Sequence, residues 1–392
     1  MTTKSSTPLC SVVAAGCATY GKRSGLYSRE LFLEALDELF VSCPKLERKH
    51  INALYLGQAF ESFEHQANPT AGISNNLGLE NIPSTRIESV SASGGAALRQ
   101  GVLGILSGQF DVVICGGVEK MTNKQTAEAL EIISMASDRP FEQWNGATLT
   151  ALNALAARSH MQIFGTTDED LALVAVKNHR NAYDNPKAFL HKLITVKDVL
   201  ESRPISTPLK LLDCSPICDG ASAVALCRPE LAPKFDDEQI DIIGSSEASD
   251  TDFVYRDELI GFKATRIAAK KAFEMSGISS ADLDFAEVHD AFTINELIAY
   301  EDLGFCDKGQ GSKLVESHDT EIGGRIPVNV SGGLKAKGHP VGSSGIGQVY
   351  EVFSQMRGHA KPSRSVKNAR TALTHSMGGA GVTVQVHVFQ KR

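Results

Sequence analysis

Three segments, two of them rich in glycine, each carry a histidine whose setting suits acid–base or electrostatic chemistry. In the longest, residues 330–345, His339 stands directly before Pro340. Proline fixes the backbone there and glycines let a ligand approach closely, so the histidine would be held on a rigid turn before a helix. The segment is not a P-loop, because it lacks the Gly-Lys-Ser/Thr ending. On its own, it also fits a tight turn with an incidental histidine.

The second segment, residues 287–293, carries His289 between an apolar stretch and a helix predicted over residues 294–303. A histidine where a strand meets a helix can donate a hydrogen bond to developing negative charge. The third segment, residues 374–381, has a glycine-rich backbone whose N–H groups can face an oxyanion. The alternatives are a loop histidine satisfied by its neighbours and a simple turn between two strands.

A serine-rich stretch upstream, residues 88–98, contains Ser91 just before two glycines. The residues that follow, to Ser107, have helical character but are crowded with glycine and alanine. Glycine in a helix costs roughly 1 kcal/mol relative to alanine. Small residues retained at that cost indicate a buried helix that another backbone approaches closely.

Apolar runs and helical spacing predict the elements that must position these segments. Strands are predicted at residues 12–16, 52–57, 111–115, 219–226, 327–330, 371–374 and 381–389. Helices are predicted at residues 31–40, 152–161, 168–182 and 343–356.

The order of these elements indicates two similar α/β halves. The last two strands of the second half are a few residues apart, whereas those of the first half are separated by residues 117–219. The first half therefore contains an insertion, which has largely helical spacing. We predict an N-terminal half at residues 1–118, completed by about 213–232, an inserted helical loop subdomain at 119–212, and a C-terminal half at 233–392.

Composition narrows the function classes. The 392 residues are 42% hydrophobic and carry a net charge of −7, which argues against nucleic acid or an anionic membrane as the main partner. The sequence has no run of about 18 apolar residues that would span a membrane. The polar start of the chain, residues 1–8, and a C-terminus without a peroxisomal signal lead us to expect a cytoplasmic protein.

The eight cysteines are scattered along the chain, unlike those of a small disulfide-linked domain. Cys214 and Cys218 are four residues apart, but no second pair at zinc spacing accompanies them. We expect packing thiols and no metal site.

The order and spacing of the serine-rich and the three histidine segments resemble those of the thiolase family over nearly the whole chain. The most specific motif is Gly-His-Pro-x-Gly-x-Ser-Gly at residues 338–345. His-Asp-Ala-Phe at 289–292, in place of Asn-Glu-Ala-Phe, resembles the sterol-carrier-protein-2-type and archaeal branch. Residues 116–121 and 212–216 add to the resemblance.

The resemblance implies a fold of two βαβαβαββ halves in a five-layered αβαβα arrangement with an inserted loop subdomain. It implies an acyltransferase, an acetyl-CoA C-acetyltransferase or 3-ketoacyl-CoA thiolase, that forms or cleaves acetoacetyl-CoA in two acyl-transfer steps. The substrate would be a coenzyme A thioester, and no covalently bound cofactor is expected.

The resemblance also implies roles for individual residues. His339 would activate the nucleophile, and His289 with His339 would polarise the thioester oxygen. The backbone N–H groups of Ser91 and near Gly379 would form a second oxyanion hole, and Ser376 occupies the position of the second catalytic residue. The residues expected to bind substrate are Gly332, Gly333, Gly338, Pro340, Ser343 and Phe292.

The sequence departs from the family where its sulfur chemistry should be. Ser91 stands at the position of the nucleophilic cysteine, and the positions that hold the second cysteine are Ser376 and Ala291. A serine hydroxyl is a poor nucleophile without a strong base. Three explanations remain: a Cys→Ser change made to trap a substrate, a natural protein that binds acyl-CoA without condensation, or a serine activated by His339.

Two further functions remain alternatives to the leading hypothesis. One is a CoA-thioester-binding or scaffold subunit that associates with an OB-fold zinc-ribbon protein and hydroxymethylglutaryl-CoA synthase. The other is a thiolase-like retro-aldolase, which needs no nucleophilic sulfur. The resemblance further implies a homodimer or homotetramer.

Overall fold

The computed structural model describes residues 7–392, so most of the polar start of the chain lies outside the described part. A nine-stranded mixed sheet has the order β3-β2-β4-β7-β1-β8-β11-β10-β9. Its strands are β1 (Cys10–Cys17), β2 (Ala53–Gly57), β3 (Ser84–Ile87), β4 (Val112–Glu119), β7 (Gly220–Cys227), β8 (Ile240–Ser249), β9 (Phe285–Glu287), β10 (Thr371–Gly378) and β11 (Thr383–Lys391).

The predicted repeat is visible in the order of the strands. Read outward from the centre, one half runs β1, β7, β4, β2, β3 and the other β8, β11, β10, β9. The parallel pairs are β2 with β3, β2 with β4 and β9 with β10, whereas the final two strands of each half pair antiparallel. Antiparallel pairing of β1 with β8 joins the two halves into one sheet.

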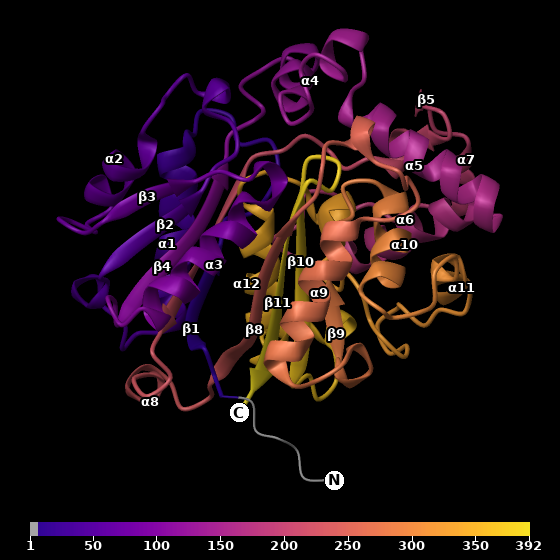
Figure 1. Ribbon diagram of the computed structural model, residues 1–392. Coiled ribbons are helices and arrows are strands. Elements are labelled where there is room, and N and C mark those ends of the chain that lie inside the picture. The colour runs from indigo at the N-terminus through magenta and orange to yellow at the C-terminus, as the bar shows by residue number, and fades with distance from the viewer. Residues whose placement is uncertain (1–6) are drawn as a thin grey trace.

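Helices arrange the two halves into five layers (Figure 1). The outer helices are α1 (Ser28–Ser42) on the first half and α9 (Lys263–Ser276) on the second. Between the halves lie α3 (Ser93–Leu106) and α12 (Ser344–Met356), which touch each other and strands of both halves. The predicted fold class is therefore confirmed.

The small residues of α3 and α12 have a steric reason. A Cβ built on Gly345 would lie 2.4 Å from the backbone nitrogen of Gly95, and one on Gly94 would lie 2.9 Å from that of Ile346. Real Cβ atoms do not come this close, so only glycine lets the two helix starts meet. The buried, closely approached helix predicted after Ser91 is confirmed.

Between β4 and β7 the chain forms the predicted insertion, along the top and upper right of Figure 1. It contains α4 (Thr126–Ser134), α5 (Leu149–Phe164), α6 (Asp168–Tyr183), α7 (Val196–Leu200) and the two-stranded sheet β5 (Pro204–Ser206) and β6 (Leu209–Lys210). Thr148 and Thr167 cap α5 and α6 by accepting backbone N–H groups of the first turn. The exact division into three parts remains a prediction.

The other helices are short or connect the layers. They are α2 (Pro69–Asn76), α8 (Ala232–Phe235), α10 (Thr293–Asp302), α11 (Gly311–Glu316) and the π-helix η8 (Gly333–Lys337). Single 3₁₀ turns are η1 (Arg48–His50), η2 (Glu61–Phe63), η3 (Val90–Ala92), η4 (Gln143–Asn145), η5 (Leu211–Asp213), η6 (Phe253–Tyr255), η7 (Ser280–Asp282) and η9 (Pro362–Arg364). Within residues 7–392, none of the helices combines the length and apolarity required to cross a membrane.

Three predicted strands differ from the structure. The strand predicted at 327–330 is reduced to one bridge, between Val328 and Ala286. The strand predicted at 111–115 runs on through its glycines to Glu119. The strand predicted at 371–374 continues to Gly378, so His375 and its neighbours lie on a strand instead of a turn.

Candidate active site

Ser91 lies on a strained turn that leads from β3 into α3. Val90, directly before it, has a φ of +50°, which a β-branched residue rarely adopts. Ser93 braces this turn: its hydroxyl donates to the Val90 carbonyl at 2.6 Å and accepts the Ser89 N–H at 2.9 Å. Strain of this kind persists where the surrounding structure enforces it, commonly at functional sites. The turn holds Ser91, which is 6% exposed, at the N-terminal end of α3.

His339 is placed to accept the Ser91 proton. Its Nε2 lies 3.2 Å from Ser91 Oγ, and its Nδ1 lies 2.7 Å from Ser344 Oγ. The Ser344 hydroxyl donates to the Pro340 carbonyl at 3.1 Å, and with its proton directed there its oxygen accepts the Nδ1–H of His339. That tautomer leaves Nε2 unprotonated and facing Ser91. Burial lowers the pKa of His339 to about 3, so the ring is neutral at pH 7.

His289 follows β9 and faces His339, with the ring centroids 5.3 Å apart in an edge-to-face arrangement. Its Nδ1 accepts the backbone N–H of Met377 at 3.4 Å, so in the neutral ring the proton is on Nε2. Burial, with smaller effects from His339 and His375, lowers the pKa of His289 well below its usual range. A neutral imidazole with a free Nε2–H can donate to an oxygen that gains negative charge.

Ser376, predicted to be catalytic, bonds to a neighbouring side chain of the protein, and its catalytic role stays a prediction. Its hydroxyl donates to Gln348 Oε1 at 3.1 Å and packs against Gly95 and Gly345. In the described residues it makes no hydrogen bond to Ser91. Ser376 occupies the face of β10 toward α3 and α12, because side chains alternate along a strand.

His375, one position earlier, contacts the site instead. Its Nδ1 accepts the backbone N–H of His289 at 3.4 Å, and its Nε2 lies 3.1 Å from Thr265 Oγ1 of α9. Burial lowers the pKa of His375 to about 3. The prediction missed this residue because it ended the strand at residue 374. In a longer strand, side chains alternate between the two faces, so His375 and Ser376 would have been expected to point in opposite directions.

The turn after β10 lies beside Ser91 and offers free donors. A Cβ on Gly378 would lie 2.3 Å from the Ser89 carbonyl, and Ser89 Oγ lies 2.9 Å from Thr383 Oγ1. Gly379 has a φ of +60°. Within residues 7–392 the N–H groups of Ser91 and Gly379 donate no hydrogen bond. This is the state that an oxyanion hole requires, as predicted, but the role itself stays a prediction.

Three glycines predicted to bind substrate are explained by packing within the protein. A Cβ on Gly332 would lie 2.5 Å from Ala182 of α6, and one on Gly333 would lie 2.2 Å from the Asp290 carboxylate. A Cβ on Gly338 would lie 2.8 Å from the sulfur of Cys218. At each glycine an atom of the protein lies where a side chain would be, and the substrate-binding role stays a prediction.

The other predicted substrate residues differ in their exposure. Ser343 is fully buried, and its hydroxyl lies 2.9 Å from that of Tyr20 and 3.1 Å from that of Ser222, so it does not face a ligand. Pro340 provides the carbonyl that fixes the His339 tautomer. Phe292, which caps the start of α10, is partly exposed, and its role stays a prediction.

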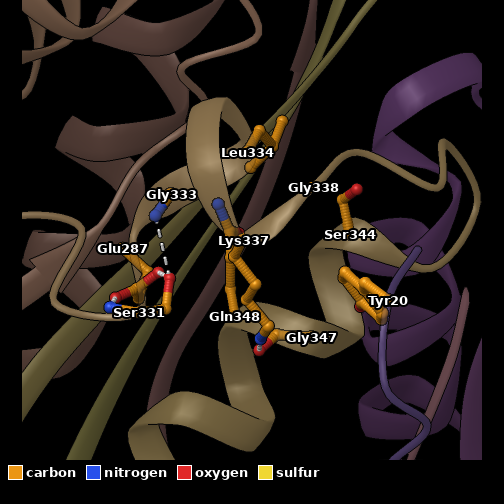
Figure 2. A pocket seen from close by; sticks show the side chains of 10 residues that line it. All are labelled: Tyr20, Glu287, Ser331, Gly333, Leu334, Lys337, Gly338, Ser344, Gly347 and Gln348. Carbon is orange, nitrogen blue, oxygen red and sulfur yellow. Dashed lines mark hydrogen bonds between the residues drawn. The ribbon is translucent and has the colours of Figure 1, made fainter. Parts of the chain in front are cut away.

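A cavity of about 10 Å³ lies behind Ser344 (Figure 2). Lys337 and Gln348 project into it from η8 and α12, and Glu287 lines it from β9. Burial raises the pKa of Glu287 to about 7. The volume is that of roughly one water molecule, so this space is too small for substrate.

No cysteine thiol of the described residues bonds to the ring of a site histidine, although Cys218 lies against the backbone of Gly338 and His339. Cys214 Sγ donates to the Lys210 carbonyl, and burial raises the pKa of its thiol to about 12. Cys115 and Cys218 are fully buried, and burial raises the pKa of both thiols. In the described part of the chain, no cluster of three His, Cys, Asp or Glu side chains could hold a metal ion.

Comparison with known families agrees with this fold and site. Residues 10–230 match the thiolase N-terminal domain, and residues 245–391 match the thiolase C-terminal domain-like family. The chain belongs to the thiolase family. It is thus an acyltransferase of the thiolase type, a class that acts on coenzyme A thioesters without an external cofactor.

Relatives place the chain near an archaeal branch. The acetyl-CoA acetyltransferase of Methanothermobacter thermautotrophicus is 44% identical over 348 residues, covering 88% of this chain and 90% of the relative. That of Methanocaldococcus jannaschii is 39% identical, covering 97% and 98%. Rabbit (Oryctolagus cuniculus) sterol carrier protein 2 is 33% identical, covering 79% of this chain and 58% of the relative.

A solved structure described as an Ltp2-ChsH2(DUF35) aldolase has the same fold. The TM-score is 0.84 at 24% identity, with 97% of this chain and 98% of that chain covered.

Proposed function

We propose that this chain provides the acyl-transfer site of an acetyl-CoA C-acetyltransferase or 3-ketoacyl-CoA thiolase that forms or cleaves acetoacetyl-CoA. One observation carries the proposal: the side chain at position 91 lies 3.2 Å from the unprotonated Nε2 of His339, at the N-terminal end of α3. The names of the two archaeal relatives support an acetyl group as the acyl group transferred.

In the first step, the nucleophile at position 91 attacks the thioester carbonyl carbon while His339 takes its proton at Nε2. The N–H groups of Ser91 and Gly379 stabilise the oxyanion. The carbon–sulfur bond then breaks, and the leaving CoA sulfur receives the proton from His339. The products are an acyl-enzyme, free CoA and a neutral histidine.

In the second step, acetyl-CoA loses an α-proton to His339 Nε2, and the enolate oxygen accepts a hydrogen bond from His289 Nε2–H. The enolate carbon attacks the acyl carbon, and the bond from that carbon to position 91 breaks. The released side chain regains the proton from His339, and acetoacetyl-CoA leaves. The enolate donor is neutral His289, so its protonation state does not change during the cycle.

Ser91 itself limits this chemistry. A hydroxyl loses its proton far less readily than a thiol, and His339, with a pKa of about 3, is a weak base. We propose that the chain as given turns over slowly and that a cysteine at position 91 would be the efficient nucleophile. At this helix end the thiolate would be stabilised by the partial positive charge of the helix.

The test is cleavage of acetoacetyl-CoA by CoA, measured with the given chain and with Ser91→Cys. We expect Ser91→Cys to be at least about 100-fold faster, and Ser91→Ala, the control without a nucleophile, to be no faster than the given chain. A folded Ser91→Cys variant without turnover, in the presence of any co-purifying partner, would contradict the proposal.

A second candidate function follows from the missing thiol. In the described residues no cysteine thiol bonds to the imidazole ring of His289 or His339, so a reaction that needs acid–base groups but no sulfur fits the same site. Retro-aldol cleavage of a β-hydroxyacyl-CoA is such a reaction. If the protein catalyses this cleavage, the chain with Ser91 should release a ketone or an aldehyde, and the Ser91→Ala variant should release it at the same rate.

Partners are also part of the proposal. A small OB-fold zinc-ribbon protein, hydroxymethylglutaryl-CoA synthase, and self-association into a dimer or tetramer remain candidates. The aldolase with the same fold is named together with a DUF35 protein, which makes a co-purifying partner protein the first thing to look for. With such a partner, a chain that binds acyl-CoA but does not condense it would act as a scaffold subunit.

A further inference from the structure

Buried polar side chains line one side of α6, in the insertion, and continue just past its end to Asn185. Lys177, Asn178, Asn181 and Asn185 are each at most 4% exposed. A polar residue is buried only at a cost unless it is hydrogen-bonded, so this face must have partners.

Three of these residues, spaced four apart, donate to backbone carbonyls of residues 328–331. Lys177 Nζ donates to the Val328 carbonyl at 2.7 Å, Asn181 Nδ2 to the Asn329 carbonyl at 3.0 Å, and Asn185 Nδ2 to the Ser331 carbonyl at 2.7 Å. These side chains take the place of a further strand at this edge of the sheet. The predicted strand at 327–330 is consequently reduced to a single bridge.

Asn178 has a different target. Its Nδ2 donates to Asp290 Oδ2 at 2.7 Å and to Glu296 Oε2 at 2.6 Å. Glu296 is already paired with Lys177 at 2.5 Å, so its charge is compensated without Asn178. Asp290 has no such cation within salt-bridge distance in the described residues.

Asp290 connects the two catalytic histidines. It directly follows His289, and its carboxylate accepts the backbone N–H groups of Leu334 at 2.6 Å and Lys335 at 3.2 Å. Those groups belong to the π-helix η8, which ends at Lys337, two residues before His339. Gly333, at the start of η8, has a φ of +60° and packs directly on this carboxylate; Figure 2 shows its N–H bonded to Ser331.

We propose that Asp290, held in place by Asn178, is a positioning residue that fixes His289 and His339 relative to each other and to position 91. The insertion thereby sets the geometry of the site through one amide–carboxylate contact. The inference rests on the roles proposed for these histidines, but its test does not depend on turnover.

The experiment measures the reactivity of a thiol placed at the site. In the Ser91→Cys chain, alkylation by iodoacetamide at position 91 is followed by peptide mass spectrometry from pH 5 to 9. A thiol that faces a well-placed His339 ionises at lower pH than a free thiol. Adding Asn178→Ala or Asp290→Asn should shift the midpoint of this profile upward by about one pH unit, a tenfold loss of thiolate at neutral pH.

Asn181→Ala is the matched control, because it removes one buried hydrogen bond from the same face of α6 but none to Asp290. We expect it to lower the unfolding temperature about as much as Asn178→Ala while the alkylation profile stays unchanged. An unchanged profile in folded Asn178→Ala, or an equal shift in Asn181→Ala, would overturn the proposal. If Asp290→Asn does not fold, the comparison of the two asparagine variants decides. If Ser91→Cys shows the expected alkylation shifts but does not transfer acyl groups, only the proposed function is contradicted.

Discussion

At the scale of single residues, the site depends on which ring nitrogen of His339 carries the proton. The Ser344 hydroxyl gives its proton to the Pro340 carbonyl, so its oxygen can only accept, and this leaves Nε2 free for Ser91. The tautomer is thus fixed by a hydroxyl five residues along the chain. A second carboxylate or charge is not needed for this purpose.

Replacing Ser344 should therefore slow catalysis without disturbing the fold. In the Ser91→Cys chain, we expect Ser344→Ala to lower kcat at least about tenfold, a part of the roughly 10²–10⁴ that positioned proton transfer contributes. Ser343→Ala is the control, since this hydroxyl is equally buried but bonds to Tyr20 and Ser222. Equal kcat values for the two variants would mean that Ser344 does not set the tautomer.

At the scale of elements, the site exists because two helix starts meet between the half-sheets. The turn with Ser91 begins α3, the turn with His339 begins α12, and glycines at both starts remove the side chains that would separate them. The same contact between α3 and α12 therefore holds both Ser91 and His339. Loss of that contact should affect stability and geometry together.

Adding one methyl group at this contact tests the argument. Gly345→Ala would place a Cβ 2.4 Å from the Gly95 nitrogen, and we expect it to reduce the free energy of unfolding by about 2 kcal/mol or more. Gly72→Ala in α2 meets nothing within 4 Å and should instead stabilise by up to about 1 kcal/mol, because alanine is the better helix former. Chemical denaturation of both variants measures the change in the free energy of unfolding. An unchanged value for Gly345→Ala would contradict the packing argument.

At the scale of the whole molecule, several histidines are buried in neutral form. Burial lowers the pKa of His339, His375 and His387 to about 3, whereas the unfolded chain has a value near 6.5. Below pH 6.5 the unfolded state therefore binds more protons than the folded state. The stability that each histidine contributes is complete above that pH and is lost as the pH falls toward 3.

His387 isolates this effect, because it lies on β11 and bonds to Ser245 and the Gly95 carbonyl, away from the reacting atoms. Between pH 7 and 5 the given chain should lose about 2 kcal/mol through this group, and His387→Gln should not. The stability difference between the two chains, measured by urea denaturation, should therefore shrink by about that amount. Other titrating groups cancel in the difference. A constant difference across this range would show that His387 is not held neutral.

The sequence alone determined the local parts of this protein. Periodic apolar runs predicted most strands and helices, since strand and helix periods are local properties of the chain. The insertion was visible as a long separation between two strands. His289, His339 and Ser91 stood out in the sequence itself, because rigid turns and helix starts are encoded by neighbouring residues.

Only the tertiary structure decided which groups meet. The strand predicted at 327–330 was wrong because side chains of α6, more than a hundred residues earlier, satisfy its edge carbonyls. Gly332 and Gly333 fit ligand contacts by their residue type, but Ala182 and Asp290 fill their space. His375, and not Ser376, faces His289 because strand length, set by pairing with β11, decides which side chain points that way. Contacts between distant segments depend on packing, which local sequence patterns do not specify.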